Sequence, residues 1–167
     1  MMQWGLVIGL GLLAAVLFAC DRHGRPVEEF GLDKLSKGIS TEGEVLAIMG
    51  QPETVWEEED GTRALQYPKG PEGVRTWEFT IDKSGKLKDY RQLLTPENFS
   101  RVTQGMSKDE IRRLLGRPRS VVQFKLKNEE VWDWRYQDVT APRLFNVHFD
   151  MGSGKVTRTS SSDALNY

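Results

Sequence analysis

The chain contains very few of the residues that cross-link folds, bind metals or carry out catalysis. Its 167 residues include one cysteine and two histidines, His23 and His148. One cysteine cannot form an internal disulfide, so we expect packing alone to hold the fold together. Two histidines and one thiol do not supply a cluster of metal ligands, or a converged nucleophile, acid and base. We therefore expect no metal, no cofactor and no enzymatic activity.

Net charge is also nearly absent, at −1 for pH 7, and gives no indication of nucleic-acid binding. The charge is nevertheless uneven along the chain. Residues 38–94 contain 11 acidic and 7 basic side chains, whereas residues 104–158 contain 7 acidic and 11 basic ones. Opposite charges could orient the two parts on each other or on a partner. Alternatively, the difference is ordinary variation in the charged residues of solvent-exposed surfaces.

Charged residues are missing altogether from the N-terminal stretch. Fifteen uncharged, mostly apolar residues run from Trp4 to Phe18, which suits a signal peptide and is short for a membrane-spanning helix of roughly 20 residues. No Lys or Arg precedes this run, so an uncleaved anchor stays open as the alternative. The sequence Leu-Phe-Ala-Cys that ends at Cys20 resembles a bacterial lipobox. The resemblance implies a signal peptide at 1–19, acyl chains on Cys20 with palmitate among them, and a lipidated tether at 20–29. The alternative for Cys20 is a stray or buried thiol.

A short pattern occurs twice and implies a duplicated unit of about 67 residues. The first copy runs from Gly38 to Pro52 and the second from Gly105 to Pro118. In each copy a Ser or Thr is followed three residues later by Glu, which is the spacing of a helix capping box. Apolar residues then follow at i, i+3 and i+4. Each ends with Gly and then Pro, which favours a helix C-terminus. We predict one amphipathic helix in each copy, preceded by a shorter helix that in the second copy starts at Thr95-Pro96-Glu97.

Alternating apolar and polar residues after each long helix predict three antiparallel strands per copy. In the second copy the inward positions are Val122, Phe124 and Leu126, then Trp132, Trp134 and Tyr136, then Phe145, Val147 and Phe149. The predicted fold class is α+β, with tandem helix-helix-strand-strand-strand repeats whose antiparallel sheets are covered on one face by helices. The repeats are expected at 30–94 and 95–158, followed by a flexible tail at 159–167.

The second copy resembles the SmpA/OmlA domain of the BamE family of bacterial lipoproteins. The likeness rests on Gly-Met-Ser107, Glu110-Ile111, Leu115-Gly116-x-Pro118, Trp134-x-Tyr136 and a strand end that leads to Gly154-Lys155. The first copy resembles the family through its helices and third strand, with Leu65-Gln66-Tyr67 in place of Trp-x-Tyr. The resemblance implies a non-enzymatic, lipid-anchored periplasmic protein that binds a partner in outer-membrane β-barrel protein assembly or envelope maintenance. Tandem copies of the fold also resemble β-lactamase inhibitor proteins, so an inhibitor or ligand-binding lipoprotein is the alternative.

The expected partners are a membrane, reached through the acyl chains on Cys20, and a protein of the cell envelope. The family resemblance implies the outer membrane, facing the periplasm. Asp21, directly after Cys20, resembles the inner-membrane retention signal of enteric lipoproteins, so the inner membrane stays open.

Six residues of the second copy are candidate interaction residues: Trp132, Trp134, Arg135, Tyr136, Lys125 and Lys127. The aromatic side chains share one strand face, which is typical of a core and also of a binding platform. The opposite face, with Arg135 and the two lysines, would present a basic surface to a partner or to lipid headgroups. His148 is expected at a solvent-facing strand position. The acidic run at 57–60 fits a solvated hairpin tip better than a site for a cation or a basic partner.

Overall fold

The computed structural model describes residues 31–70, 73–139 and 141–164. The expected signal peptide at 1–19, Cys20 and the tether at 20–29 lie outside the described residues, as do residues 165–167. None of the described helices combines the length and the hydrophobicity that crossing a membrane requires.

Two units of the same element order follow one another along the chain. The first comprises a 3-10 helix η1 (Leu32–Lys34), α1 (Glu42–Met49), β1 (Thr54–Glu57), β2 (Arg63–Pro68), β3 (Thr76–Ile81) and β4 (Leu87–Gln92). The second comprises α2 (Pro96–Ser100), α3 (Lys108–Leu115), β5 (Ser120–Phe124), a 3-10 helix η2 (Lys125–Lys127), β6 (Glu129–Gln137), β7 (Pro142–Asp150) and β8 (Val156–Asp163). Each unit forms its own four-stranded antiparallel sheet, in the order β1-β2-β3-β4 and β5-β6-β7-β8. The predicted α+β class with antiparallel sheets is confirmed, and the two sheets are separate.

Each sheet has a fourth strand that the sequence pattern did not predict. In β8 only Val156 is buried, and the remaining side chains are charged residues, serines and threonines. An edge strand of this kind is held by backbone hydrogen bonds to one neighbour, so it needs no apolar alternation. The expectation of a flexible tail from Thr159 is therefore wrong for residues 159–163, which pair with β7 in register from Thr159 opposite Val147 to Asp163 opposite Arg143.

The two long helices begin and end in the same way. Thr41 and Ser107 each form the predicted capping box, with Glu44 and Glu110 respectively. Gly50 and Gly116 end the helices with φ of 81° and 77°, a backbone region that only glycine enters without strain. Each N-cap residue also forms an isolated bridge to the lysine directly before the fourth strand, Thr41 to Lys86 and Ser107 to Lys155.

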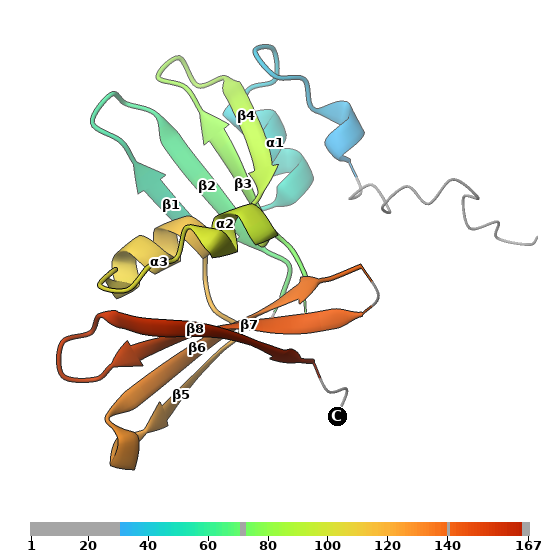
Figure 1. The fold of residues 1–167 in the computed structure, drawn as a ribbon. Coiled ribbons are helices and arrows are strands. Elements are labelled where there is room, and N and C mark those ends of the chain that lie inside the picture. Colours follow the sequence, from blue (N-terminus) through green and yellow to red (C-terminus); the bar gives the residue numbers. More distant parts are fainter. Residues whose placement is uncertain (1–30, 71–72, 140, 165–167) are drawn as a thin grey trace, which may run out of the picture.

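The units stack so that helices and sheets alternate. Figure 1 shows α1 against one face of the first sheet, and α2 and α3 between the first sheet and the second. The first core joins Val45 of α1 to apolar residues of the sheet, among them Leu65 and Phe79. The second core joins Ile111 and Leu115 of α3 to apolar residues of β6, β7 and β8. The helix α3 thus packs on its own sheet and also faces the outer side of the first sheet.

The prediction that Val122, Phe124 and Leu126 point into the core is wrong. Their exposed fractions are 45%, 44% and 105%. The strand β5 ends at Phe124, and the following residues turn through η2 to Asn128, which has a φ of 51°. Within the described residues, side chains of α2, α3, β6, β7 and β8 already fill the second core, and none comes from β5.

Candidate interaction surface

The aromatic stripe of β6 belongs to the core. Trp132, Trp134 and Tyr136 are 7%, 1% and 9% exposed. The indole Nε1 of Trp134 donates a hydrogen bond of 3.2 Å to the carbonyl oxygen of Gly116 at the end of α3. Burying a side chain of this size contributes at least about 2 kcal/mol to folding. Of the two readings of this stripe, its burial favours the core over the exposed platform.

Arg135 points to the other side of the second sheet and lines a small cavity where the two units meet. The cavity has a volume of about 100 Å³, and its walls include Arg75 and Arg117 as well as Arg119 and Arg135. Nε of Arg119 lies 2.7 Å from Oδ1 of the buried Asp133. Arg75, Arg119 and Arg135 all interact with other groups of the chain. The cluster therefore serves the junction between the units, rather than forming part of a continuous basic face with the lysines.

Lys125 and Lys127 do not share a strand face with Arg135. Both lie in η2, the turn between β5 and β6, and both are exposed. The ammonium of Lys127 lies 6.0 Å from the centre of the Phe124 ring. The predicted basic sheet surface is therefore wrong, because the strand ends one residue before the first lysine.

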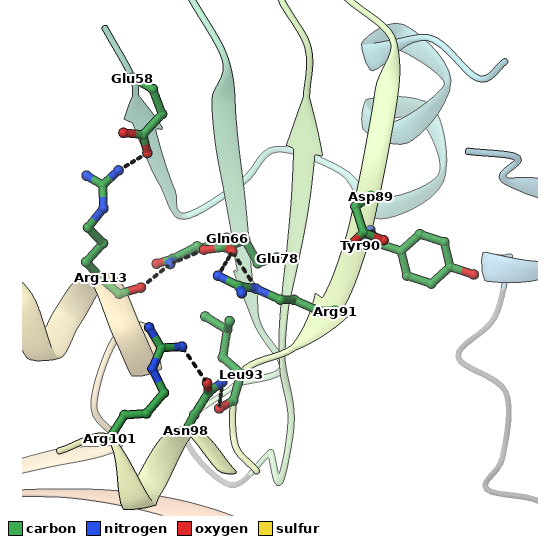
Figure 2. A network of polar contacts seen from close by, with 10 residues as sticks. All are labelled: Glu58, Gln66, Glu78, Asp89, Tyr90, Arg91, Leu93, Asn98, Arg101 and Arg113. Atoms are coloured by element: carbon green, nitrogen blue, oxygen red, sulfur yellow. Dashed lines mark hydrogen bonds and ion pairs between the residues drawn. The ribbon is translucent and has the colours of Figure 1, made fainter. Parts of the chain in front are cut away.

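A polar network joins the outer face of the first sheet to the second unit (Figure 2). Nε2 of the buried Gln66 donates to Oε2 of Glu78 at 2.9 Å and to the carbonyl oxygen of Arg113 at 3.1 Å. Nη2 of Arg91 lies 2.7 Å from Oε1 of Glu78. The bonds to Glu78 satisfy a buried carboxylate that would be costly to leave unpaired. The bond to the carbonyl oxygen of Arg113 links this network to the helix α3.

Arg113 also uses its side chain at this junction. Its guanidinium forms an ion pair with Glu58, drawn in Figure 2, and lies 5.4 Å from the ring of Trp56. Nearby, Arg117 lies 3.1 Å from a carboxylate oxygen of Glu53. Acidic residues of the first unit thus meet basic residues of α3 and the segment after it. The uneven distribution of charge along the sequence thus produces ion pairs between the two units.

The acidic run at 57–60 lies at the β1–β2 hairpin as predicted, but it is not wholly solvated. Glu58 takes part in the ion pair with Arg113. The carboxylate of Asp60 accepts a hydrogen bond from the backbone N–H of Thr62 at 2.8 Å, which holds the pKa of Asp60 below its usual value. The described part of the chain contains no group of three or more His, Cys, Asp or Glu side chains that could hold a metal ion.

His148 lies on the sheet face opposite Val147 and Phe149, as predicted, but it is 7% exposed instead of solvent-facing. Its Nδ1 lies 2.9 Å from Glu129 and its Nε2 2.9 Å from the hydroxyl of Ser160. Nη2 of Arg158 lies 2.9 Å from the same Glu129 oxygen. Burial, and next the charge of Arg158, lower the pKa of His148 below 6.5. The ring is therefore mainly neutral at pH 7 and fills a structural role in the network.

The largest exposed apolar cluster of the described chain lies on β5 and η2, where the sequence analysis expected core. Val121 is 50% exposed, and Val122, Phe124 and Leu126 are also exposed. We call residues 120–127 the β5 edge. One signal in the sequence could have identified it: Val121 and Val122 are adjacent, so at least one of them must point away from the core. Leu126 stands between two lysines, which also disfavours burial.

Comparison with known proteins gives one family match. Residues 92–160 match the family model described as the outer membrane protein assembly factor BamE domain. This range contains α2 and α3 and ends within β8, so it covers most of the second unit. No curated protein matches the chain.

Three solved structures resemble the chain at low similarity. They are a DUF4309 family protein from Bacillus subtilis (17% identity, 77% of this chain and 82% of that one, TM-score 0.30), a putative β-lactamase inhibitor protein from Streptococcus mutans (12%, 75% and 84%, TM-score 0.31) and an extracellular protein containing an SCP domain from Bacillus anthracis (10%, 87% and 50%, TM-score 0.32). These TM-scores are too low to support an argument about function.

Proposed function

We propose that this chain is a protein-binding module without catalytic activity that acts in outer-membrane protein assembly from the periplasmic side. The observation that carries the proposal is the match of residues 92–160 to the BamE domain. The matched range begins just before α2 and ends within β8, so it corresponds to nearly one whole packed unit. Because one fold can carry many functions, the placement of the polar groups must also agree with this role.

The placement of the polar groups agrees with a binding role. The buried carboxylate of Glu130 lies 2.7 Å from the ammonium of Lys108 and accepts hydrogen bonds from Gln123 and the Trp132 indole. His148 is held between Glu129 and Ser160. Neighbouring side chains hold each of these two buried groups, which gives both of them a structural role.

We also propose that both units derive from the same domain. The support is structural: the two capping boxes, the two glycine helix ends and the two isolated bridges occupy equivalent places. The third and fourth strands of each sheet also show a register shift at the same place, after Thr80 in β3 and after His148 in β7. The first unit has diverged by taking α3 of the second unit onto its outer face.

The lipid anchor is a further part of the proposal. Acyl chains on Cys20 would confine both units to a membrane surface and raise their effective concentration toward membrane-bound partners. Replacing Cys20 by serine should move the protein from the membrane fraction to the soluble periplasmic fraction. Unchanged membrane association of this variant would contradict lipidation. Separation of inner and outer membranes on a density gradient tests whether Asp21 retains the protein in the inner membrane.

Chemical cross-linking in intact envelopes, followed by capture of the protein, tests the proposed function. We expect to recover components of the β-barrel assembly machinery, and less of them with the Cys20→Ser variant as a control. Recovery of a single soluble hydrolase would contradict the proposal and support the inhibitor alternative. Recovery of no protein partner would also contradict it.

A further inference from the structure

The β5 edge is the sheet edge least protected against a further strand. Within the described residues β5 pairs with one neighbour, β6, so every second residue directs its N–H and C=O away from the sheet. Val121, Val122 and Phe124 are exposed along this five-residue strand.

The other three edges carry features that discourage pairing. The strand β4 presents Lys88, Asp89 and Arg91, and most of the exposed side chains of β8 are serines and threonines. The strand β1 has four residues and one exposed apolar side chain, Val55. Charged residues, short length and polar composition are the usual ways in which proteins blunt an edge.

Basic residues flank the apolar part of the β5 edge on both sides. Arg117 and Arg119 precede it, and Lys125 and Lys127 follow it. A second copy of the chain pairing antiparallel would place the lysines of one copy beside the arginines of the other, and parallel pairing would place lysine beside lysine. Like charges opposite one another destabilise a sheet. Arg117 and Arg119 already pair with Glu53 and Asp133, so the two exposed lysines are the cations that select an occupant, and they favour one with an acidic residue at the end that meets them.

We propose that the β5 edge binds an extended segment of a partner protein as a fifth strand of the second sheet. The segment has apolar side chains at alternate positions, which lie over Val122 and Phe124, and a carboxylate that meets Lys125 and Lys127. Strand addition supplies affinity through main-chain hydrogen bonds and specificity through the alternate side chains. The inference deepens the proposed protein-binding function and rests on it.

The probe for this site is a capped peptide of alternating valine and threonine with an aspartate at each end, labelled with a fluorophore. Binding to the full chain is followed by fluorescence anisotropy. The test variant is Val122→Lys and the matched control is Val55→Lys, because both valines are 45% exposed on an edge strand. We expect Val122→Lys to weaken binding by about tenfold or more, and Val55→Lys to leave it unchanged. Because both positions are exposed, both variants should keep the unfolding midpoint of the parent protein.

Two further measurements define the mode of binding. Bound peptide should slow amide hydrogen exchange in 120–124, and a peptide with lysine in place of each aspartate should bind about tenfold more weakly. Equal affinity of the parent and Val122→Lys, or protection of β1 or β8 amides instead, would overturn the inference. A dimer in sedimentation that Val122→Lys dissociates would overturn it too, because the occupant would then be a second copy.

The failure of this inference can be told apart from failure of the proposed function. If the Val122→Lys variant captures the same amount of envelope partner as the parent chain, the β5 edge is not the binding site, and the proposed function stands. If the parent chain captures no partner at all, the proposed function fails whatever the peptide does.

Discussion

Substituting alanine for Gly116, and separately for Gly50, measures how closely the two units pack. The two glycines end equivalent helices with nearly the same backbone, φ of 77° and ψ of −164° at Gly116 against 81° and −161° at Gly50. This region costs a residue with a Cβ about 1–3 kcal/mol. A methyl group at Gly116 would also lie 2.7 Å from Cγ2 of Thr76 on the first sheet, whereas nothing lies within 4 Å at Gly50.

The difference between the two variants isolates the contact across the junction. Gly50→Ala should lower the free energy of unfolding by about 1–3 kcal/mol. Gly116→Ala should lower it by a similar amount plus about 1–3 kcal/mol for overpacking against the buried Thr76. Equilibrium urea unfolding measures both values.

A second substitution checks the cause of the extra loss. Thr76→Ser removes Cγ2, so in the Gly116→Ala background it should recover about 1 kcal/mol or more as a coupling energy, and in the Gly50→Ala background it should recover none. Equal losses in the two alanine variants, or no coupling with Thr76→Ser, would refute the packing of α3 against the first sheet.

Three other predictions concern the second unit. Ser107→Ala removes the cap of α3 and should lower the free energy of unfolding by about 1 kcal/mol in urea titrations; no loss would contradict the capping box. Lys108→Met leaves the buried carboxylate of Glu130 without its ion pair and should cost about 3 kcal/mol, while adding Glu130→Gln should restore most of that loss; additive losses would contradict the pairing. His148 has a folded pKa below 6.5, so the unfolded chain binds the proton first and stability should fall as pH decreases below about 6.5. An NMR titration should place the ring's midpoint below that value, and His148→Gln should remove this part of the pH dependence; a midpoint above 6.5 would contradict the burial.

Local signals in the sequence predicted the helices well. The capping boxes of Thr41 and Ser107 depend on residues within one turn, and the glycine ends depend on a single residue each, so no tertiary information was needed. The same holds for the paired strands β2 and β3, and β6 and β7, because large apolar residues occupy alternate positions in each strand. These helices and strands were sufficient to predict the α+β fold class.

Edge strands were predicted poorly because their burial is decided by distant parts of the chain. The strand β8 has too few apolar residues to show a period, yet its backbone pairs along β7. Apolar residues alternate in the strand β5, yet none of its side chains belongs to the core of the second unit. For β8 the strand's own residues gave no signal, whereas for β5 the adjacent valines gave one that the apolar period outweighed.

Some candidate interaction residues were placed correctly from the sequence and others were not, again because burial depends on distant parts of the chain. Trp132, Trp134 and Tyr136 were recognised as sharing a face, and the structure shows that α2 and α3 cover it. Arg135 was predicted to join a basic face with Lys125 and Lys127, but a turn separates them. Val122 of β5 was assigned to the core, although its neighbour Val121 is also apolar and two adjacent strand residues cannot both point inward.

Photo-crosslinking from single positions in living cells tests most directly that the second unit binds an envelope protein. A photoreactive amino acid at Val122 is compared with one at Val55, the equally exposed valine on the edge of the first sheet. The account predicts an adduct between position 122 and a component of the β-barrel assembly machinery, and no such adduct from position 55. The same adducts from both positions, or none from position 122, would contradict it.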